Sequence, residues 1–434
     1  MMWNEAHEAM SRDELAYLQG KRLVRLVKRM YKNVEYYRHK MEIAGLEPGD
    51  ICGIEDLKKL PFTTKEDLRQ LYPFGMLAVP QSEIVRYHTS NGTTGVETIV
   101  GYTRNDIDIW SECVARCIYM AGLNRDDIIQ IAYNYGMFTG GLGAHYGAEK
   151  VGAAVVPASM GNTSKVINMM RDLGVTGIMC TPSYLGRLAR EIELRGEKDK
   201  LKLKAAICGG ESWSHTQRQR IEEILNIKTF DIYGLSEVSG PGVACECQYG
   251  EGMHIQEDYF VTELLDRKTN AEMDEGEEGE LVLTTLHKEG VPLIRYKTDD
   301  TACITYKKCK CGRTFARISK LKGSDDDMIM FRGSSVYPVK LREAFKYFTD
   351  KGFKILIEID TTNGLDLIRT KIITSDSREQ ILFESENIII EEVSHIILKN
   401  MGMKPQECVI IKDDCYDKIE NVKITDLRRT AGEV

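Results

Sequence analysis

One stretch near residue 90, RYHTSNGTTG, places small hydroxyl side chains between glycines directly after an apolar, strand-like approach. Glycines let backbone N–H groups converge without a Cβ atom in the way, and the hydroxyls of Ser90, Thr93 and Thr94 add further donors. Such a loop can surround an anion, and phosphate oxygens suit it. A Ser/Thr/Gly turn is more often a plain connection, because these residues dominate turns for conformational reasons. Two later segments, Asp231–Glu237 and Tyr296–Asp300, favour phosphate binding over the plain turn.

The composition indicates a globular enzyme with two or three domains, since the chain has 434 residues and is 42% hydrophobic. Its formal charge of -8 argues against a nucleic-acid partner, which requires a positive face. The first residues are partly acidic and contain no apolar run, so we expect neither a secretory signal nor a membrane anchor. A cytoplasmic protein is therefore predicted, with its twelve cysteines reduced.

The elements that position these residues follow an alternating pattern. Residues 12–45 show apolar positions at helical spacing, and from about residue 80 short β-branched runs alternate with helical stretches. That alternation predicts α/β layers around a mainly parallel sheet, whose strands carry ligands at their carboxyl ends. The predicted parallel strands are Asp127–Ala132, Ala153–Pro157, Gly177–Cys180 and Ala205–Cys208.

The chain is predicted to have two domains. Strand-like segments and turns dominate from residue 278 to the charged stretch 323–327, where we place a hinge. The predicted N-terminal domain covers residues 1–324. Residues 325–434 are predicted to form a small α+β lid, with strands at 353–360, 371–374 and 408–412 and a helix near 378–402.

Five motifs in one order resemble the acyl-adenylate-forming superfamily, in particular its phenylacetate-CoA ligase branch, over nearly the whole chain. They are Ser90–Gly95, Asn134–Gly147, Asp231–Gly242, Pro292–Tyr296 and Arg332–Pro338. The resemblance implies a large multi-sheet N-terminal domain with a small mobile α+β C-terminal lid. It also implies a two-step reaction, in which an aryl or arylacetic acid attacks the α-phosphate of ATP to give acyl-AMP, and coenzyme A then displaces AMP.

For ATP, the resemblance implies that Ser90, Thr93 and Thr94 hold the phosphates, with Thr93 also acting in catalysis. Glu237 is implied to hold Mg²⁺ and to be catalytic, and a carboxylate is the hard oxygen ligand that this ion prefers. Ser236 is a further phosphate ligand.

For the nucleoside, the resemblance implies that Asp231 binds the adenine amino group and that Tyr233 stacks on adenine. Asp300 is implied to accept both ribose hydroxyls. Three neighbouring residues would line the adenine pocket, namely Gly209, Gly210 and Glu211.

The aromatic acid is expected near the glycine run that starts at residue 140. Tyr135 and Phe138 offer aromatic walls, and Gly141 permits a close backbone approach. His145 is a candidate for steering the carboxylate, although a lone histidine is more often a structural hydrogen-bonding residue. An ordinary aromatic core patch is the alternative interpretation.

A second kind of site is suggested by cysteines. Cys247 and His254 are separated by six residues, and Cys309 and Cys311 flank a lysine. Three thiolates and one imidazole suit a closed, tetrahedral structural zinc site, whereas free cysteines are commonly small buried hydrophobic residues. Because some members of the branch carry a similar arrangement, we expect zinc in the subregion 245–313, with Cys245 as the substitute for Cys247.

The chain departs from the family pattern at three basic positions, which are occupied by Val96, Ser324 and Glu420. All three would approach anionic ligands. Losing a positioned cation costs about 3 to 4 kcal/mol in comparable oxyanion systems, so adenylation is expected to be weakened. Asp326 can still serve as the hinge pivot.

Other basic residues are candidates to replace these cations. Lys418 or Lys423 are candidates for the role of the C-terminal lysine, and Arg317, Lys320 or Lys322 for the nucleotide. Two alternatives to a coenzyme A ligase therefore remain open. One is a weakened paralogue that binds nucleotide, acyl-CoA or an aromatic acid as a sensor, and the other is an adenylating enzyme with a different acceptor. A homodimer is permitted by apolar positions on the first helix.

Overall fold

The computed structural model describes residues 2–90, 98–319, 321, 329–331, 334–336, 338–362, 365–374, 386–412 and 420–427. The chain forms two compact units. The large unit contains most residues up to Ser324, and the small unit contains most residues from Asp325 onward. Each unit has a hydrophobic core of its own.

A nine-stranded sheet forms the centre of the large unit, in the order β13-β14-β9-β8-β7-β6-β5-β3-β4. Its parallel half consists of β3 (Ile128–Ile131), β4 (Ala154–Val156), β5 (Gly177–Cys180), β6 (Ala205–Cys208) and β7 (Lys228–Tyr233). Both β5 and β6 are buried along their whole length, which explains their uninterrupted apolar sequences. The four predicted parallel strands are confirmed.

The other half of this sheet is antiparallel, which the alternating pattern did not predict. It consists of β8 (Ala244–Glu246), β9 (Met253–Ile255), β13 (Ile304–Thr305) and β14 (Arg317–Ile318). After β7 the chain turns back through β8 instead of crossing over through a helix. These strands are only two or three residues long, so they offer little periodicity to detect.

Two smaller antiparallel sheets complete the strands of the large unit that the structure describes. One pairs β1 (Arg86–Ser90) with β2 (Thr98–Tyr102). The other contains β10 (Phe260–Leu265), β11 (Gly279–Thr285) and β12 (Tyr296–Ala302). A bridge between Thr63 and Tyr296 attaches an N-terminal segment to β12.

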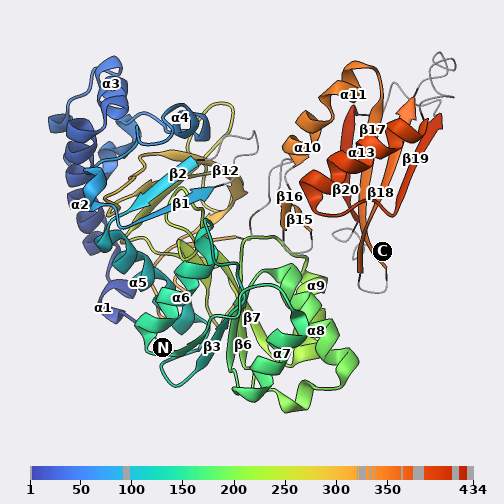
Figure 1. The fold of residues 1–434 in the computed structure, drawn as a ribbon. Coiled ribbons are helices and arrows are strands. Elements are labelled where there is room, and N and C mark those ends of the chain that lie inside the picture. Colours follow the sequence, from blue (N-terminus) through green and yellow to red (C-terminus); the bar gives the residue numbers. More distant parts are fainter. Residues whose placement is uncertain are drawn as a thin grey trace. The chain divides into compact units, whose positions relative to one another are not determined.

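Helices connect and cover these strands (Figure 1). In sequence order they are α5 (Arg104–Met120), α6 (Thr139–Val151), α7 (Thr163–Asp172), α8 (Pro182–Arg195) and α9 (His215–Leu225). A capping box of Thr103 and Asp106 starts α5. The helices α5 and α6 pack closely because Gly143 has no side chain, since a Cβ atom there would lie 2.2 Å from Cζ2 of Trp110.

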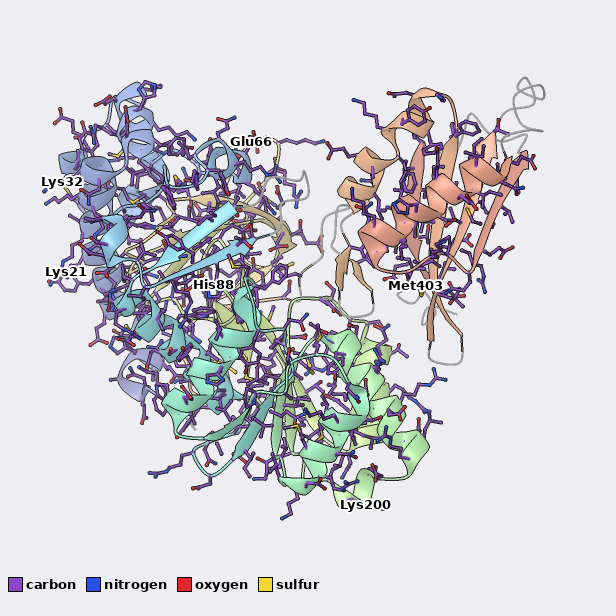
Figure 2. The ribbon with its side chains drawn as sticks, viewed as in Figure 1. Lys21, Lys32, Glu66, His88, Lys200 and Met403 are labelled. Carbon is purple, nitrogen blue, oxygen red and sulfur yellow. The ribbon has the colours of Figure 1, made fainter. Side chains whose placement is uncertain are left out.

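The N-terminal region is helical. It contains α1 (Glu5–Glu8), α2 (Arg12–Asn33), α3 (Glu35–Ile43) and α4 (Lys65–Gln70), with 3-10 helices at Pro48–Asp50, Ile54–Lys59, Gln81–Glu83 and, later, Lys198–Lys200. The helical stretch predicted at 12–45 is interrupted at Val34, whose backbone is extended with φ -117° and whose side chain is buried. Lys21 and Lys32 mark the exposed face of α2 in Figure 2.

The small unit contains a four-stranded sheet in the order β19-β18-β17-β20. Its strands are β17 (Lys354–Thr362), β18 (Leu365–Thr374), β19 (Glu407–Lys412) and β20 (Val422–Asp426), accompanied by β15 (Ile329–Phe331), β16 (Ser334–Val336), α10 (Pro338–Ala344), α11 (Lys346–Asp350) and α13 (Glu386–Met401). Alternating buried residues of β17, including Ile355 and Ile357, share one hydrophobic core with α13 residues such as Val393. The predicted α+β character is confirmed.

None of the helices that the structure describes is both long and apolar enough to cross a lipid bilayer.

Candidate active site

The predicted nucleotide-binding segments follow strands that end at one edge of the nine-stranded sheet. The strand β6 leads directly into Gly209, while β7 carries Asp231 and Tyr233 and leads into Ser236 and Glu237. Cys208 and Asp231 are register partners in the parallel pair β6–β7, so both segments leave the sheet at the same level. Open α/β sheets bind ligands at this edge. The fold therefore gathers these residues at a position suited to a ligand.

Backbone crowding explains the paired glycines after β6. A Cβ atom on Gly209 would lie 2.3 Å from the carbonyl oxygen of Ile232, and Gly210 has φ +84°, which favours glycine. The next residue, Glu211, accepts hydrogen bonds from the backbone N–H and the hydroxyl of Ser183 at 3.2 and 2.8 Å. Its carboxylate thus caps the start of α8, while the backbone of this turn lies beside β7.

The carboxylate of Glu237 is the centre of the predicted phosphate site. Its side chain is only 5% exposed, and the hydroxyl of Ser90 donates to its Oε1 at 2.7 Å. The ammonium of Lys65 lies 3.7 Å from the same oxygen. Ser90 also shares a very short hydrogen bond with Thr98 on the neighbouring strand. The structure therefore brings together the predicted phosphate residue Ser90 and the predicted magnesium residue Glu237, 147 positions apart.

A buried lysine, Lys288, supports the Glu237 segment from its backbone side. Its Nζ atom donates to the carbonyl oxygens of Glu237 at 3.1 Å and Val238 at 2.7 Å, and it lies 4.7 Å from the ring centre of Tyr102. Burial lowers the pKa of Lys288 to about 7, against the opposing influence of Asp106 and Glu237. These two hydrogen bonds fix the position of the backbone at Glu237.

Tyr233 and Asp300 are direct neighbours. The hydroxyl of Tyr233 donates to Oδ2 of Asp300 at 2.7 Å. Burial, followed by the charge of Asp300, holds the pKa of Tyr233 well above its usual value, so the phenol keeps its proton and donates. Residues predicted for adenine and ribose, from β7 and β12, therefore lie side by side. The half-buried Asp231 donates its backbone N–H to Glu246 at 2.9 Å, and its role at adenine stays a prediction.

Ser236 connects the Glu237 segment to α6 and β2. Its hydroxyl is 3.0 Å from that of Thr139, the first residue of α6, and its carbonyl oxygen accepts from Tyr102 at 3.3 Å. Thr139 therefore belongs to the surroundings of the predicted phosphate site. The same loop region is held to β1, because Thr89 and Met137 are joined by a backbone hydrogen bond of 2.9 Å.

His88, labelled in Figure 2, strengthens this attachment of β1. Its Nδ1 lies 2.9 Å from the carbonyl oxygen of Met137. Since a carbonyl oxygen only accepts, Nδ1 carries the proton. Burial lowers the pKa of His88, which keeps the ring neutral. The end of β1, where the predicted phosphate loop begins, is thus rigidly placed.

The residues predicted for the aromatic acid lie on α6 and the loop before it. Tyr135 and Nδ1 of His145 are 3.2 Å apart, and Nε2 of His145 is 3.1 Å from Glu149. Both ring nitrogens therefore have structural partners. Phe138 is 38% exposed, and a Cβ atom on Gly141 would lie 2.5 Å from the carbonyl oxygen of Asn134. This close approach joins two segments of the protein itself, so the substrate role of Gly141 stays a prediction, as do those of Tyr135, Phe138 and His145.

Several predicted residues lie outside the described part of the chain. They are Thr93, Thr94, Asp326 and Lys418, together with Lys320, Lys322 and the substituted positions Val96 and Ser324. Glu420 is described and is exposed just before β20, and Lys423 is exposed on that strand.

The predicted cysteine and histidine residues form one cluster. The ligand atoms of Cys247, His254, Cys309 and Cys311 all lie within 4.8 Å of one another. The sulfurs of Cys247 and Cys309 are 3.7 Å apart, and the Cys311 sulfur lies 3.4 Å from Nε2 of His254. Cys245 points elsewhere, with its sulfur 3.9 Å from the carbonyl oxygen of Cys117, so no substitute for Cys247 is needed.

The chemistry of the cluster suits a metal ion. Nδ1 of His254 lies 3.3 Å from the carbonyl oxygen of Phe315 and therefore carries the proton, which leaves the Nε2 lone pair for a metal. A hydrogen bond from Cys247 lowers the pKa of Cys311 and favours its thiolate, the ligand form. Three sulfurs and one imidazole nitrogen form a donor set typical of zinc.

Arg317 lies beside this cluster and has other partners. On β14 it pairs in register with His254. Its Nη1 donates to the backbone carbonyl and the carboxylate of Glu251 at 2.8 and 3.0 Å, and its Nη2 donates to the carbonyl oxygen of Lys307 at 2.9 Å. These bonds hold neighbouring loops together. The nucleotide role predicted for Arg317 gains no support from them and stays a prediction.

Lys65 and Lys288 were not predicted from the sequence. No motif spacing indicates Lys65, because its proximity to Glu237 depends on contacts between distant segments. Lys288 could have been suspected, since it is a charged residue within the otherwise largely apolar stretch 281–294.

The chain is similar to known proteins of one family. Residues 78–287 match the family model described as AMP-binding enzyme. Over 430 residues the chain is 40% identical to the phenylacetate-coenzyme A ligase of Escherichia coli. The alignment covers 98% of each chain. It is 45% identical to the Thermus thermophilus phenylacetate-coenzyme A ligase over 79% of this chain and 77% of that protein.

Among solved structures, a 2-hydroxyisobutyryl-CoA ligase in complex with 2-HIB-AMP and CoA superimposes with a TM-score of 0.85 and 25% identity. The match covers 98% of this chain and 92% of that one. The predicted superfamily and branch are confirmed by these similarities. The chain belongs to the phenylacetate-CoA ligase branch of the acyl-adenylate-forming, AMP-binding enzymes.

Proposed function

We propose that the protein is an acid-thiol ligase that couples phenylacetate, or a closely related arylacetic acid, to coenzyme A. In the first step a carboxylate oxygen of the acid bonds to the α-phosphorus of ATP, and the bond from that phosphorus to the bridging oxygen breaks. Pyrophosphate leaves with the bonding electrons. In the second step the thiol of coenzyme A adds to the acyl carbon and AMP departs, while the thiol proton is released.

The observation that carries this proposal is the contact between Ser90 and Glu237. It joins the start of the predicted phosphate loop to a buried carboxylate suited to a metal–phosphate complex. Phosphoryl and nucleotidyl transfer require positioned donors and neutralised charge more than a protein nucleophile. The full-length similarity to a phenylacetate-coenzyme A ligase supports the same acid and the same thiol.

Several residues have roles in the first step. Glu237 would hold magnesium, which when bound neutralises charge on the phosphates. Thr93 and Thr94 would donate hydrogen bonds to phosphate oxygens, and so would Ser90 once its hydroxyl turns from Glu237. Tyr233 packs against adenine while its hydroxyl orients Asp300, and this contact supports a ribose role for Asp300 next to the adenine. Ser236 adds a phosphate donor.

The acyl group is assigned to the aromatic region around Tyr135 and Phe138. Gly141 keeps the backbone of α6 close to the loop before it, and His145 is proposed to orient Tyr135 through the contact at 3.2 Å. The residues 325–434 would act as the lid, with Asp326 as its pivot and Lys418 as a candidate cation. A cytoplasmic location and a homodimer stay predictions.

We also propose that Cys247, His254, Cys309 and Cys311 hold a structural zinc ion. The cluster leaves no ligand position for a substrate, and when bound the metal would cross-link two loops of the large unit. Its contribution would be to stability.

A coupled assay tests the function. Purified protein is incubated with ATP, magnesium, coenzyme A and phenylacetate, and phenylacetyl-CoA and AMP are quantified by chromatography. We expect equal amounts of both products, and none with phenylacetamide, which lacks the attacking carboxylate. AMP without the thioester, appearing only when an amine or a carrier protein is supplied, would favour the enzyme with another acceptor. Binding of ATP without any AMP would favour the sensor.

A further inference from the structure

Hydrogen bonds fix the backbone segment that carries Lys65 beside the predicted phosphate site. Lys65 is the first residue of α4, which lies beside β12 (Figure 1). The preceding Thr63 receives a backbone hydrogen bond from Lys297 and donates one to Arg295, at 2.9 and 3.1 Å. Its hydroxyl also donates to the carbonyl oxygen of Ile294 at 2.7 Å. The backbone before Lys65 is therefore fixed to the strand that carries Asp300.

The turn that follows is fixed as well. Thr64 and Asp67 form a capping box, in which Asp67 accepts from the backbone N–H of Thr64 at 2.7 Å and from its hydroxyl at 2.8 Å. Asp67 also accepts a hydrogen bond from Nζ of Lys40 at 3.2 Å. Asp67 is occupied in this way, and the other acid of α4, Glu66, pairs with Arg69 at 3.4 Å. The ion pair of Lys65 within the described ranges is with Glu237.

The distance between Lys65 and Glu237 leaves the ammonium available. At 3.7 Å from Oε1 it forms an ion pair but not a hydrogen bond. Within the described ranges, its three N–H donors make no hydrogen bond. Its side chain is 28% exposed, whereas that of Glu237 is 5% exposed. A donor-rich cation therefore faces the carboxylate from the accessible side.

Lys288 differs from Lys65 in this respect. It is buried and its Nζ is committed to two backbone carbonyls behind Glu237. It can position the segment, but its donors do not reach a ligand in front of the carboxylate. Among the lysines described around Glu237, Lys65 is thus the one with donors to offer.

We propose that Lys65 is a catalytic residue that binds the β- and γ-phosphates of ATP and stabilises the departing pyrophosphate. This inference rests on the proposed function. When Glu237 takes part in metal binding, the Lys65 ammonium exchanges its carboxylate partner for phosphate oxygens. As the bond between the α-phosphorus and the bridging oxygen breaks, negative charge grows on pyrophosphate, where a positioned ammonium is most effective. Lys65 would thereby replace positive charge that the chain lacks at Val96, Ser324 and Glu420.

The two half-reactions separate this role from a structural one. Pyrophosphate takes part only in adenylation. We expect Lys65→Met to lower phenylacetate-dependent exchange of labelled pyrophosphate into ATP by about 10²- to 10³-fold at saturating magnesium. Formation of phenylacetyl-CoA from synthetic phenylacetyl-AMP should stay within about twofold of the wild type, because no pyrophosphate is involved. Lys65→Arg keeps the charge and should retain more exchange than Lys65→Met.

The control is Lys59→Met, which removes a neighbouring lysine that pairs with Asp56 and is 49% exposed. It should leave both half-reactions unchanged. Thermal unfolding of all variants verifies folding, and Lys65→Arg keeps the test decisive should Lys65→Met unfold. Unchanged exchange in Lys65→Met, or an equal loss in both half-reactions, would overturn the role of Lys65 alone. No exchange in the wild type with any aromatic acid would overturn the proposed function, and this inference with it.

Discussion

Replacing Cys309 by serine is expected to destabilise the large unit without impairing the chemistry. The substitution removes one of four ligand atoms that lie within 4.8 Å of one another. It also removes the sulfur that lies 3.7 Å from that of Cys247. A zinc ion bound there would lose one corner of its closed tetrahedral set, and with it the connection between the loop of Cys247 and the loop of Cys309.

The size of the effect follows from the loop that this connection closes. Cys247 and Cys309 are 62 residues apart. On the chain-entropy relation for cross-links, closing a loop of that length contributes about 4 kcal/mol by restricting the unfolded chain. Because three ligands remain and unfolded cysteines also bind metal, we expect a loss of about 2 to 4 kcal/mol. For a domain of this size, that lowers the melting temperature by roughly 3 to 6 °C.

The assay compares thermal unfolding of the wild type, Cys309→Ser and Cys52→Ser by circular dichroism. Cys52 is exposed and outside the cluster, so its replacement controls for the loss of a thiol. Metal content is measured by elemental analysis of each protein. We expect zinc in the wild type and in Cys52→Ser, and ligase turnover of Cys309→Ser at room temperature within about twofold of the wild type.

Two results would refute this reasoning. A wild type without metal, melting at the same temperature as Cys309→Ser, would show that the cysteines only pack against one another. A collapse of turnover with an unchanged melting temperature would place the cluster in the chemistry instead.

Three further predictions concern other buried groups. Burial lowers the pKa of Lys288 to about 7 in the folded protein, against a reference value of 10.5 for the unfolded chain. Between pH 7 and pH 10.5 the unfolded chain therefore binds more protons than the folded one, and stability rises with pH. Above about pH 7, the free energy of unfolding in urea should therefore rise by about 1.4 kcal/mol per pH unit in the wild type relative to Lys288→Met. A pH-independent difference between the two proteins would contradict this. Tyr233→Phe removes the 2.7 Å bond to Asp300 and should raise KM for ATP by about tenfold with little change in kcat, and unchanged ATP saturation curves would contradict it. Arg116→Met removes two hydrogen bonds to the fully buried Asp258, at 2.8 and 3.0 Å, while His7 stays 3.0 Å from that carboxylate. The unfolding free energy should fall by about 3 kcal/mol, the low end of the range for a broken buried ion pair, and a loss below about 1 kcal/mol in urea titration would count against it.

The strands of the parallel sheet could be predicted because their signal is local. Gly177–Cys180 and Ala205–Cys208 are continuous buried runs, and the structure assigns both as β5 and β6 with the same bounds. The break between α2 and α3 could not be predicted, because helical spacing continues through Val34. That residue is 1% exposed, so its extended conformation depends on packing against the core.

In the candidate site, too, some residues could be predicted from the sequence and others could not. The residues of sequence motifs, such as Glu237 and the cysteine pair Cys309 and Cys311, could be named beforehand because each motif is contiguous. The position of Lys65 could not, since it depends on hydrogen bonds between Thr63 and the start of β12, more than 230 positions away. Local patterns do not specify such contacts.

Exchange of labelled pyrophosphate into ATP, measured with a panel of aromatic acids, shows whether the protein forms an acyl-adenylate. We expect magnesium-dependent exchange with phenylacetate or a close arylacetic acid, in the absence of coenzyme A. We also expect loss of this exchange in Glu237→Gln, whose uncharged side chain no longer attracts a metal ion. Measurable ATP binding with no exchange for any acid would contradict these expectations, as would full exchange in Glu237→Gln.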